Sequence, residues 1–147
     1  MKPVLSVFLL FLATKAFSQQ ENDSAMIIKL LADDYKTMTN WNLDTHIKNV
    51  TPTYLLIENG EIWDNKKESE FYLSHVNKSV DRTDHFDIKY VRVYGDVAYA
   101  VYFLESDFKD NDKLKTKTWN ESVVFRKING EWKIELIHST PVAAKNN

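Results

Sequence analysis

The sequence predicts an α+β protein in which three N-terminal helices pack over a curved antiparallel sheet. Helical spacing of apolar residues dominates the first half of the chain and changes to strand-like alternation after Asp84. Two turn signals, Gly95-Asp96 and Asn129-Gly130, divide the second half into four long strands. A chain of 147 residues with 44% hydrophobic residues is long and apolar enough for one globular domain.

Residues 1–18 have the features of an export signal. A positive start at Met1-Lys2 precedes a compact apolar run over residues 4–14, which is too short to span a bilayer, and residues 16–18 resemble a cleavage point. We therefore expect cleavage after Ser18 and a single mature domain over residues 19–147, located in a periplasm or outside the cell. A buried N-terminal helix is the alternative. The chain has no cysteine, which excludes disulfides and a thiolate nucleophile.

Three helical stretches precede the long strands. The first is predicted to begin near Asp23 or Ser24, which are good N-cap residues. One of its faces carries Ile27, Leu31, Tyr35 and Met38. A shorter stripe over residues 43–50 stops at Pro52. Short strands over 54–57 and 62–63 flank the Asn59-Gly60 turn, and a third helix is predicted from Asn65 to about Ser79.

The last predicted hairpin gives a specific hypothesis about a site. A two-residue Asn129-Gly130 turn followed by regular alternation places Phe125 opposite Ile134 and Glu121 opposite His138 on the apolar face. A three-residue turn would oppose Phe125 to a lysine, so we favour the two-residue turn. Glu121 and His138 are then either an acid/base dyad or ligand anchor, or a structural pair that fixes the sheet edge.

The other hairpin is apolar on both faces. Val91, Val93, Ala98, Ala100, Tyr102 and Leu104 share one face, and Ile88, Tyr90, Tyr99, Val101 and Phe103 share the other. A sheet that is apolar on both sides needs two covers. The helices supply one cover, and we expect a second copy of the chain to supply the other in a homodimer. A surface with some exposed aromatic residues is the alternative.

These motifs resemble the nuclear transport factor 2-like superfamily in its SnoaL-like branch. The segment from Trp119 to Thr140 resembles the ending of that branch, Gly95–Ala98 its recurring turn, and residues 23–50 its helical opening. The resemblance implies a cone-shaped α+β barrel with a deep pocket, commonly dimeric through the sheet. Its members include isomerases, cyclases, hydrolases, dehydratases and non-catalytic binding domains, so the fold alone leaves function open.

Ketosteroid isomerases, which belong to the same superfamily, suggest further candidate residues. They use an Asp base on the early strand together with a Tyr and a protonated Asp. Glu58 lies near the position of the base and Tyr35 near that of the Tyr, while no residue matches the second Asp.

Several other function classes are disfavoured. The net charge of −2 provides no basic face for nucleic acid. The four histidines are scattered without a ligand spacing, so we expect no metal. No Gly-rich phosphate loop is present, and we expect no cofactor. No second apolar run reaches transmembrane length, so we expect no membrane association once the signal is removed.

The candidate pocket wall combines aromatic rings with titratable groups. It comprises Trp41, His46, Tyr54, Trp63, Phe71, His75, Tyr102 and Trp119, together with Glu121 and His138. The leading hypothesis is a binding module for a small, partly apolar molecule. The alternative is a lyase, isomerase or hydrolase in which His138 transfers a proton and Glu121 orients it. A protein-interaction domain with a vestigial cavity is a third possibility.

Overall fold

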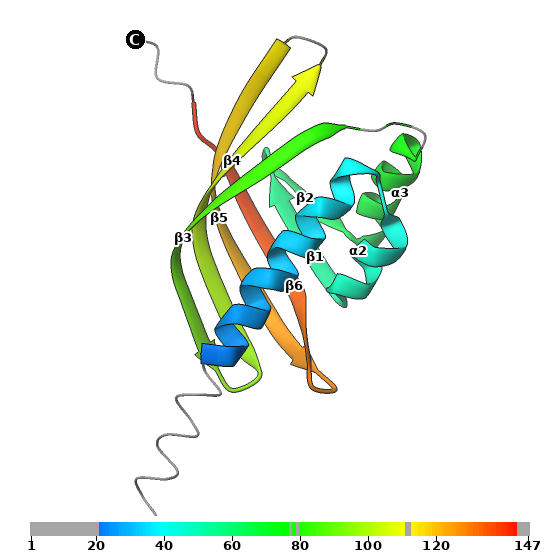
Figure 1. Ribbon diagram of the computed structural model, residues 1–147. Coiled ribbons are helices and arrows are strands. Elements are labelled where there is room, and N and C mark those ends of the chain that lie inside the picture. The colour runs from blue at the N-terminus through cyan, green and yellow to red at the C-terminus, as the bar shows by residue number, and fades with distance from the viewer. Residues whose placement is uncertain (1–20, 77, 79, 111–112, 144–147) are drawn as a thin grey trace, which may run out of the picture.

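The computed structural model describes residues 21–76, 78, 80–110 and 113–143 (Figure 1). A helix over residues 21–36 leads into the 3-10 turn η1 (Thr37–Thr39), and α2 (Leu43–Asn49) and α3 (Asn65–His75) follow. The strands are β1 (Val50–Glu58), β2 (Glu61–Asp64), β3 (Asp81–Tyr94), β4 (Val97–Asp110), β5 (Lys113–Ile128) and β6 (Glu131–Pro141). No helix of the described part could cross a membrane. The predicted export signal lies outside the described residues.

All six strands form one curved sheet in the order β2-β1-β6-β5-β4-β3, with β2 and β3 as its open edges. Helix 21–36 lies across the concave face, and α2 and α3 cover the end near β1 and β2 (Figure 1). This arrangement confirms the predicted α+β cone. The sequence predicted an antiparallel sheet, but β1 and β6 run parallel. They can do so because no hairpin joins them, whereas strands joined by tight turns must be antiparallel.

The Asn129-Gly130 turn has the predicted two-residue geometry. Both residues have positive φ, 53° at Asn129 and 84° at Gly130, and the turn pairs Ile128 with Glu131. Such left-handed backbone matches the twist of the flanking strands and is least costly for Asn and Gly. The other two predicted turns are also present, at Asn59-Gly60 and Gly95-Asp96.

The core lies between helix 21–36 and the concave face of the sheet. The predicted helix stripe is confirmed, because Ile27, Leu31 and Tyr35 are all at most 5% exposed. The small residues Ala98 and Ala100 on β4 are also buried and leave room for the helix to approach. Each fully buried large apolar side chain contributes roughly 1.5–3 kcal/mol. The prediction that Asp23 is an N-cap residue is wrong, because residues 21–36 are all helical and Asp23 lies inside the helix.

A bulge in β6 changes the register beyond the turn. Phe125 pairs with Ile134 as predicted, but the neighbouring Val124 pairs with Leu136, so Glu135 is an extra residue on β6. The prediction that Glu121 faces His138 is therefore wrong. One extra residue reverses which side chains of a strand face the core.

Glu121 instead pairs with Ser139, and His138 pairs with Ser122. Ile137 and Ser139 are buried on the concave face, while His138 is exposed on the convex face. Apolar alternation could not reveal the bulge, since residues 134, 136 and 137 are all large aliphatic side chains that suit either parity. The bulge lies where β1 joins β6, and the register between these two strands shifts at the same place.

The convex face keeps most of its predicted apolar character. Tyr90 is 55% exposed and Tyr99 is 39% exposed, and Val101 and Phe103 are half-buried on the same side. The prediction for Ile88 is wrong, because the β3 register shifts between Ile88 and Tyr90 and Ile88 packs against the core.

Candidate functional site

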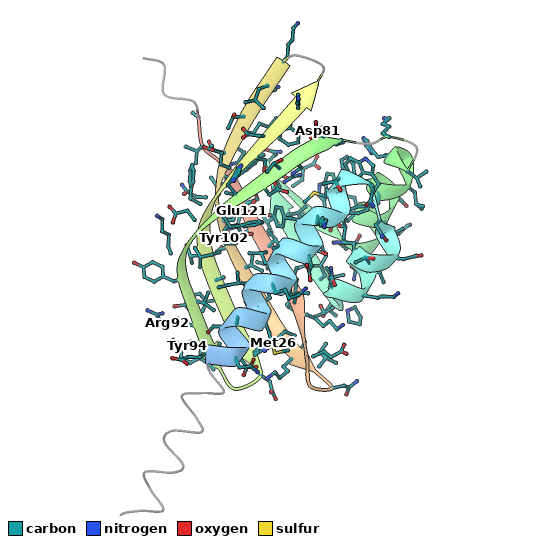
Figure 2. All side chains as sticks on the ribbon, in the orientation of Figure 1. Met26, Asp81, Arg92, Tyr94, Tyr102 and Glu121 are labelled. Carbon is teal, nitrogen blue, oxygen red and sulfur yellow. The ribbon has the colours of Figure 1, made fainter. Side chains whose placement is uncertain are left out.

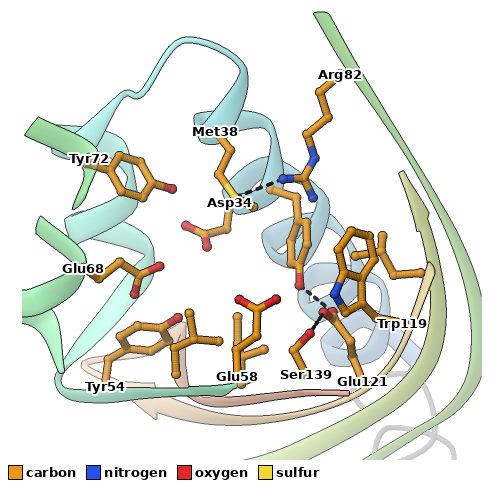
Figure 3. Close-up of a pocket in the computed structure, with 14 residues that line it drawn as sticks. Asp34, Met38, Tyr54, Glu58, Glu68, Tyr72, Arg82, Trp119, Glu121 and Ser139 are labelled. Carbon is orange, nitrogen blue, oxygen red and sulfur yellow. Dashed lines mark hydrogen bonds between the residues drawn. The ribbon is translucent and has the colours of Figure 1, made fainter. Parts of the chain in front are cut away.

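A cavity of about 100 Å³ lies between helix 21–36 and the concave face of the sheet (Figure 3). Apolar side chains line part of it, namely Met38, Leu56, Leu104 and Ile137. Carboxylates line another part and come from four separate elements: Asp34, Glu58, Glu68 and Glu121. Carboxylates are rarely buried unless they are paired, so we looked for the groups that offset the burial of each one.

Glu121 projects from β5 beneath helix 21–36 and is 5% exposed (Figure 2). Its carboxylate accepts hydrogen bonds from the Tyr35 hydroxyl and, at 2.6 Å, from Ser139 Oγ. The Tyr102 hydroxyl donates to the Tyr35 oxygen at 3.4 Å. Burial raises the pKa of Tyr35 well above its usual value, and Tyr102 and Glu121 raise it further. The phenol therefore keeps its proton and serves as a donor to Glu121.

Glu58 approaches the same cavity from the end of β1 (Figure 3). Burial raises the pKa of Glu58, and the nearby Glu121 raises it further. A hydrogen bond with Trp119 and the charges of Lys117 and Arg82 oppose the shift. Glu58 is thus a carboxyl group with increased proton affinity beside a second acid, which is a common arrangement for proton transfer.

His46 on α2 lies one layer behind the wall, between two of the wall carboxylates. Its Nδ1 is 3.1 Å from Asp34 Oδ1, and its Nε2 is 3.5 Å from Glu68 Oε2. Asn49 Nδ2 also donates to Asp34 at 3.1 Å, and Tyr72 stacks on the imidazole with ring centroids 4.9 Å apart. Burial lowers the pKa of His46, but Asp34 and Glu68 outweigh it and raise the pKa to about 10. His46 is therefore an imidazolium at neutral pH.

Glu68 is the carboxylate whose hydrogen bonding is least complete. It is 8% exposed, and its Oε2 has no hydrogen-bond partner among the described residues. The 3.5 Å separation from His46 Nε2 leaves that nitrogen without a hydrogen bond as well. Glu68 points into the cavity beside Tyr54 (Figure 3). Burial raises the pKa of Tyr54 well above its usual value, with the charge of Glu68 next in importance.

Arg82 on β3 is the guanidinium on the cavity wall. Its Nε donates to Asp84 at 2.7 Å, and Nη2 donates to Ser106 Oγ at 3.2 Å. The guanidinium carbon also lies 5.5 Å from the centre of the Tyr35 ring. Because Asp84 already pairs with it, Arg82 supplies little uncompensated positive charge to the cavity.

A shallower groove of about 320 Å³ adjoins the cavity at the outer end of β5 and β6. Glu58 and Trp119 line both spaces, and the rest of the groove is formed by residues 59, 116–118, 141 and 142. A molecule that places one group in the cavity therefore has room for a further part in the groove.

The structure brings some of the predicted pocket residues together at this cavity. Tyr54, Trp119 and Glu121 line it. His46 and Tyr102 do not, but each contacts a residue that does: His46 through Asp34 and Glu68, and Tyr102 through its hydroxyl bond to Tyr35.

Four predicted wall residues lie elsewhere, in an aromatic cluster between α3, β2 and the turn before α2. Its members are Trp41, Trp63, Phe71 and His75, with ring centroids 4.5–5.4 Å apart. None of the four lines the cavity, and for Phe71 and His75 the reason is the rotation of α3. Glu68 and Tyr72, four residues apart, face the cavity, whereas the pair Phe71 and His75 starts three residues later and is displaced by about 60° around the helix axis.

His138 was also placed wrongly, because the β6 bulge turns its side chain to the convex face. Asp34 and Glu68 were missed by the sequence analysis. Asp34 had a usable signal, since it lies three residues after Leu31 and four before Met38, within the apolar stripe of the first helix. The sequence signal for Glu68 was weaker: it lies one helical turn before Tyr72, which faces inward.

The fold and the cavity together define an α+β cone protein with a carboxylate-rich pocket. A family model described as the SnoaL-like domain matches residues 27–144, and the chain belongs to this family. No curated protein matches the chain.

Solved structures with this fold are similar over most of their length. A hub homology domain of a CaMKII from Chlamydomonas reinhardtii is 16% identical, with a TM-score of 0.73, 82% of this chain covered and 99% of the other. A nuclear transport factor 2-like superfamily protein from Salmonella enterica is 20% identical, with a TM-score of 0.69 and coverage of 86% and 95%. A ketosteroid isomerase-like protein from Erwinia carotovora is 19% identical, with a TM-score of 0.64 and coverage of 83% and 98%. At these identities the likeness establishes the fold alone.

Proposed function

We propose that this protein binds a small, partly apolar molecule in the cavity beneath helix 21–36. One observation carries the proposal: an unfilled cavity is lined by aliphatic side chains on one part and by four carboxylates on another. Charges placed against a cavity cost stability, and a core shaped for stability alone would be filled and apolar. A pocket with an apolar wall and a few convergent polar groups is the usual form of a small-molecule site.

The dimensions of the site limit what enters it. An apolar cavity of about 150 Å³ holds a benzene-sized molecule, so the 100 Å³ here admits a smaller group. The larger groove continues from it past Glu58 and Trp119. The ligand we propose therefore has one small group in the cavity and a second part in the groove.

Filling the cavity tests this proposal. Leu56→Trp places an indole in the space, whereas Leu55→Trp places it on the opposite face of the same strand. We expect ligands found by native mass spectrometry or an NMR fragment screen to bind wild type and Leu55→Trp but not Leu56→Trp. Equal binding to wild type and Leu56→Trp would show that the cavity is not the site.

Acid/base catalysis is a second candidate, favoured by the raised pKa of Glu58 beside Glu121. Here Glu58 takes the role first assigned to His138: it accepts a proton from a carbon acid and returns it. Tyr35 turns its single hydroxyl proton from Glu121 to the substrate oxygen and stabilises the negative charge that develops there. A base carboxylate with a tyrosine and a second acid resembles the ketosteroid isomerase arrangement.

Hydrogen exchange on a bound ligand separates catalysis from binding alone. An enzyme of this type exchanges the acidic C–H protons of its ligand with deuterated water, which proton NMR detects. Glu58→Gln should abolish the exchange while the ligand still binds. If wild type and Glu58→Gln give the same exchange rate, the catalytic candidate fails and the binding proposal remains.

We also propose that two copies of the chain associate through the convex face. The support is the exposed apolar surface around Tyr90, Val97 and Tyr99, which suits burial against a second sheet. Solved structures with this fold include proteins named as hub and association domains.

Export is a further proposal, supported by the sequence features of residues 1–18. Mass measurement of the mature protein from fractionated cells tests it. A mature chain that begins at Gln19 in the exported fraction agrees with the proposal. A chain that keeps residues 1–18 and stays with the cytoplasmic fraction contradicts it.

A further inference from the structure

Three of the four acids on the cavity wall are already compensated within the protein. Glu121 accepts hydrogen bonds from two hydroxyl groups. Asp34 and Glu68 flank the imidazolium of His46, at 3.1 Å and 3.5 Å from its two nitrogens. Buried charges that are compensated in this way do not require a ligand of opposite charge. The property that is left to select a ligand is the shape of the space.

The cavity and the groove meet at two side chains. Among the described residues, Glu58 and Trp119 are the ones that line both spaces. Figure 3 shows them reaching toward the same space from β1 and β5. A molecule that extends from the groove into the cavity must pass between these two side chains. We call this passage the neck.

The sheet register fixes the position of the neck. On β6, Ser139 lies between Glu58 of β1 and Glu121 of β5. Two residues further along β6, Pro141 has Trp119 as its partner on β5 but no partner on β1, because β1 ends at Glu58. The neck therefore lies over the end of β6, at the place where the sheet loses a strand.

Trp119 is held firmly on its side of the neck. It is half-buried and packs against the core, with Leu104 beside it on β4 and Pro141 beside it on β6. The adjacent Thr118 carbonyl accepts a hydrogen bond from the Val142 amide at 2.8 Å, which ties this part of β5 to the end of β6. A large ring packed between two strands leaves little room for the neck to widen, so its size limits the group that can pass.

The spaces on the two sides of the neck differ in character. The cavity of about 100 Å³ has the aliphatic side chains of Leu56, Leu104 and Ile137 in its wall. It is smaller than the apolar cavity of about 150 Å³ that holds benzene. The groove of about 320 Å³ offers polar side chains, among them those of Lys117 and Thr118. An amphiphile with a slender apolar end and a polar remainder suits both spaces.

We propose that Trp119 determines the specificity of this site: its indole narrows the neck, so that only a slender, unbranched apolar end of an amphiphilic ligand enters the cavity. The polar remainder of the molecule stays in the groove. This inference rests on the proposed binding function and specifies the shape of its ligand.

Two probes with the same hydroxyl head test the shape requirement. The end of 1-butanol is a slender chain, whereas the end of benzyl alcohol is a ring, and NMR titration measures the affinity of each. We expect wild type to bind 1-butanol roughly tenfold more tightly, since forcing extra volume into a packed space is costly. Equal binding of the two probes, or tighter binding of benzyl alcohol, would overturn the inference and leave the binding proposal intact.

Trp119→Ala assigns the selection to the indole. This variant should bind benzyl alcohol roughly tenfold more tightly than wild type does, because the ring can then pass the neck. Trp63→Ala is the matched control: Trp63 is also half-buried, but its ring packs 5.4 Å from that of Phe71, outside both spaces. It should bind both probes as wild type does. Equal affinity of wild type and Trp119→Ala for benzyl alcohol would contradict the proposal.

A milder variant keeps the test decisive if Trp119→Ala fails to fold, which circular dichroism detects. Trp119→Phe keeps an aromatic ring against the core but removes part of the indole from the neck. It should still bind benzyl alcohol more tightly than wild type does. An unchanged affinity would again count against a role for Trp119 in selection.

Failure of the underlying binding proposal gives a different result. If neither probe binds to wild type or Trp119→Ala, and an NMR fragment screen finds no molecule whose binding Leu56→Trp abolishes, the proposed binding function fails as well. If 1-butanol binds equally to wild type and Leu56→Trp, the chain does not enter the cavity, and both proposals are wrong.

Discussion

The hydroxyl of Tyr35 donates a hydrogen bond to the carboxylate of Glu121, although the two residues are 86 positions apart in the sequence. One lies on the N-terminal helix and the other on the central strand β5, so this bond joins the two layers of the fold at the cavity. Both groups are at most 5% exposed. The bond therefore has a role in stability that can be measured without knowledge of the ligand.

Tyr35→Phe should lower the free energy of unfolding by about 1–3 kcal/mol, because it removes a donor from a buried carboxylate. Urea denaturation at neutral pH measures the change. Tyr90→Phe is the control, since Tyr90 is 55% exposed and its change should stay within about 0.5 kcal/mol. A Tyr35→Phe variant as stable as Tyr90→Phe would show that Glu121 does not depend on this donor.

His46 should stabilise the fold in a pH-dependent manner. Its pKa is raised from 6.5 to about 10 in the folded chain, so the folded state binds a proton that the unfolded state releases between these values. This stabilisation is complete below about pH 6.5 and is lost as the pH rises toward 10. The difference in unfolding free energy between wild type and His46→Gln should therefore shrink over that range, by at most about 1.4 kcal/mol per pH unit.

Urea denaturation at about pH 6, 8 and 10 measures that difference. His85→Gln serves as the control, because the His85 side chain is 58% exposed and its loss should cost less than about 0.5 kcal/mol at each pH. A His46→Gln difference that stays constant from pH 6 to pH 10 would contradict the charged state assigned to His46.

Glu58 should titrate above its ordinary value, and Glu121 should be part of the reason. Carbon-13 NMR of the side-chain carboxyl should show a midpoint above 4.5 in wild type. Glu121→Gln should move the midpoint part of the way down, because it removes a neighbouring negative charge but leaves burial, the larger cause. Glu131→Gln, at an exposed turn, should leave it unchanged. If Glu121→Gln leaves the midpoint unchanged, the charge of Glu121 does not contribute to the raised pKa of Glu58.

Self-association through the convex face should respond to a single charge. Tyr99→Glu places a carboxylate in the apolar surface near Val97 and Tyr90, and sedimentation should then show monomers where wild type forms dimers. Lys66→Glu on α3 is the control, because its side chain is 84% exposed and lies away from the sheet. A wild-type protein that sediments as a monomer at every concentration would refute the proposed dimer.

Features that depend only on neighbouring residues were predictable from the sequence. The helical stripe of Ile27, Leu31 and Tyr35 and the turn at Asn129-Gly130 were predictable because spacing and left-handed φ are local properties. These local features led to the α+β order and to the strand pairing next to that turn. They also led to part of the cavity wall. Tyr54, Trp119 and Glu121 belong to that part.

Packing between distant strands sets which side of β6 faces the cavity. The bulge at Glu135 lies where β6 takes β1 as a parallel neighbour, so its position depends on a strand some eighty residues earlier. Local alternation is equally satisfied by Leu136 or Ile137 facing inward, and packing against β1 and β5 selects Ile137. That choice places Ser139 rather than His138 beside Glu121. The same dependence on packing hid Asp34 and Glu68, because a carboxylate is stable in a core only where distant partners such as His46 meet it.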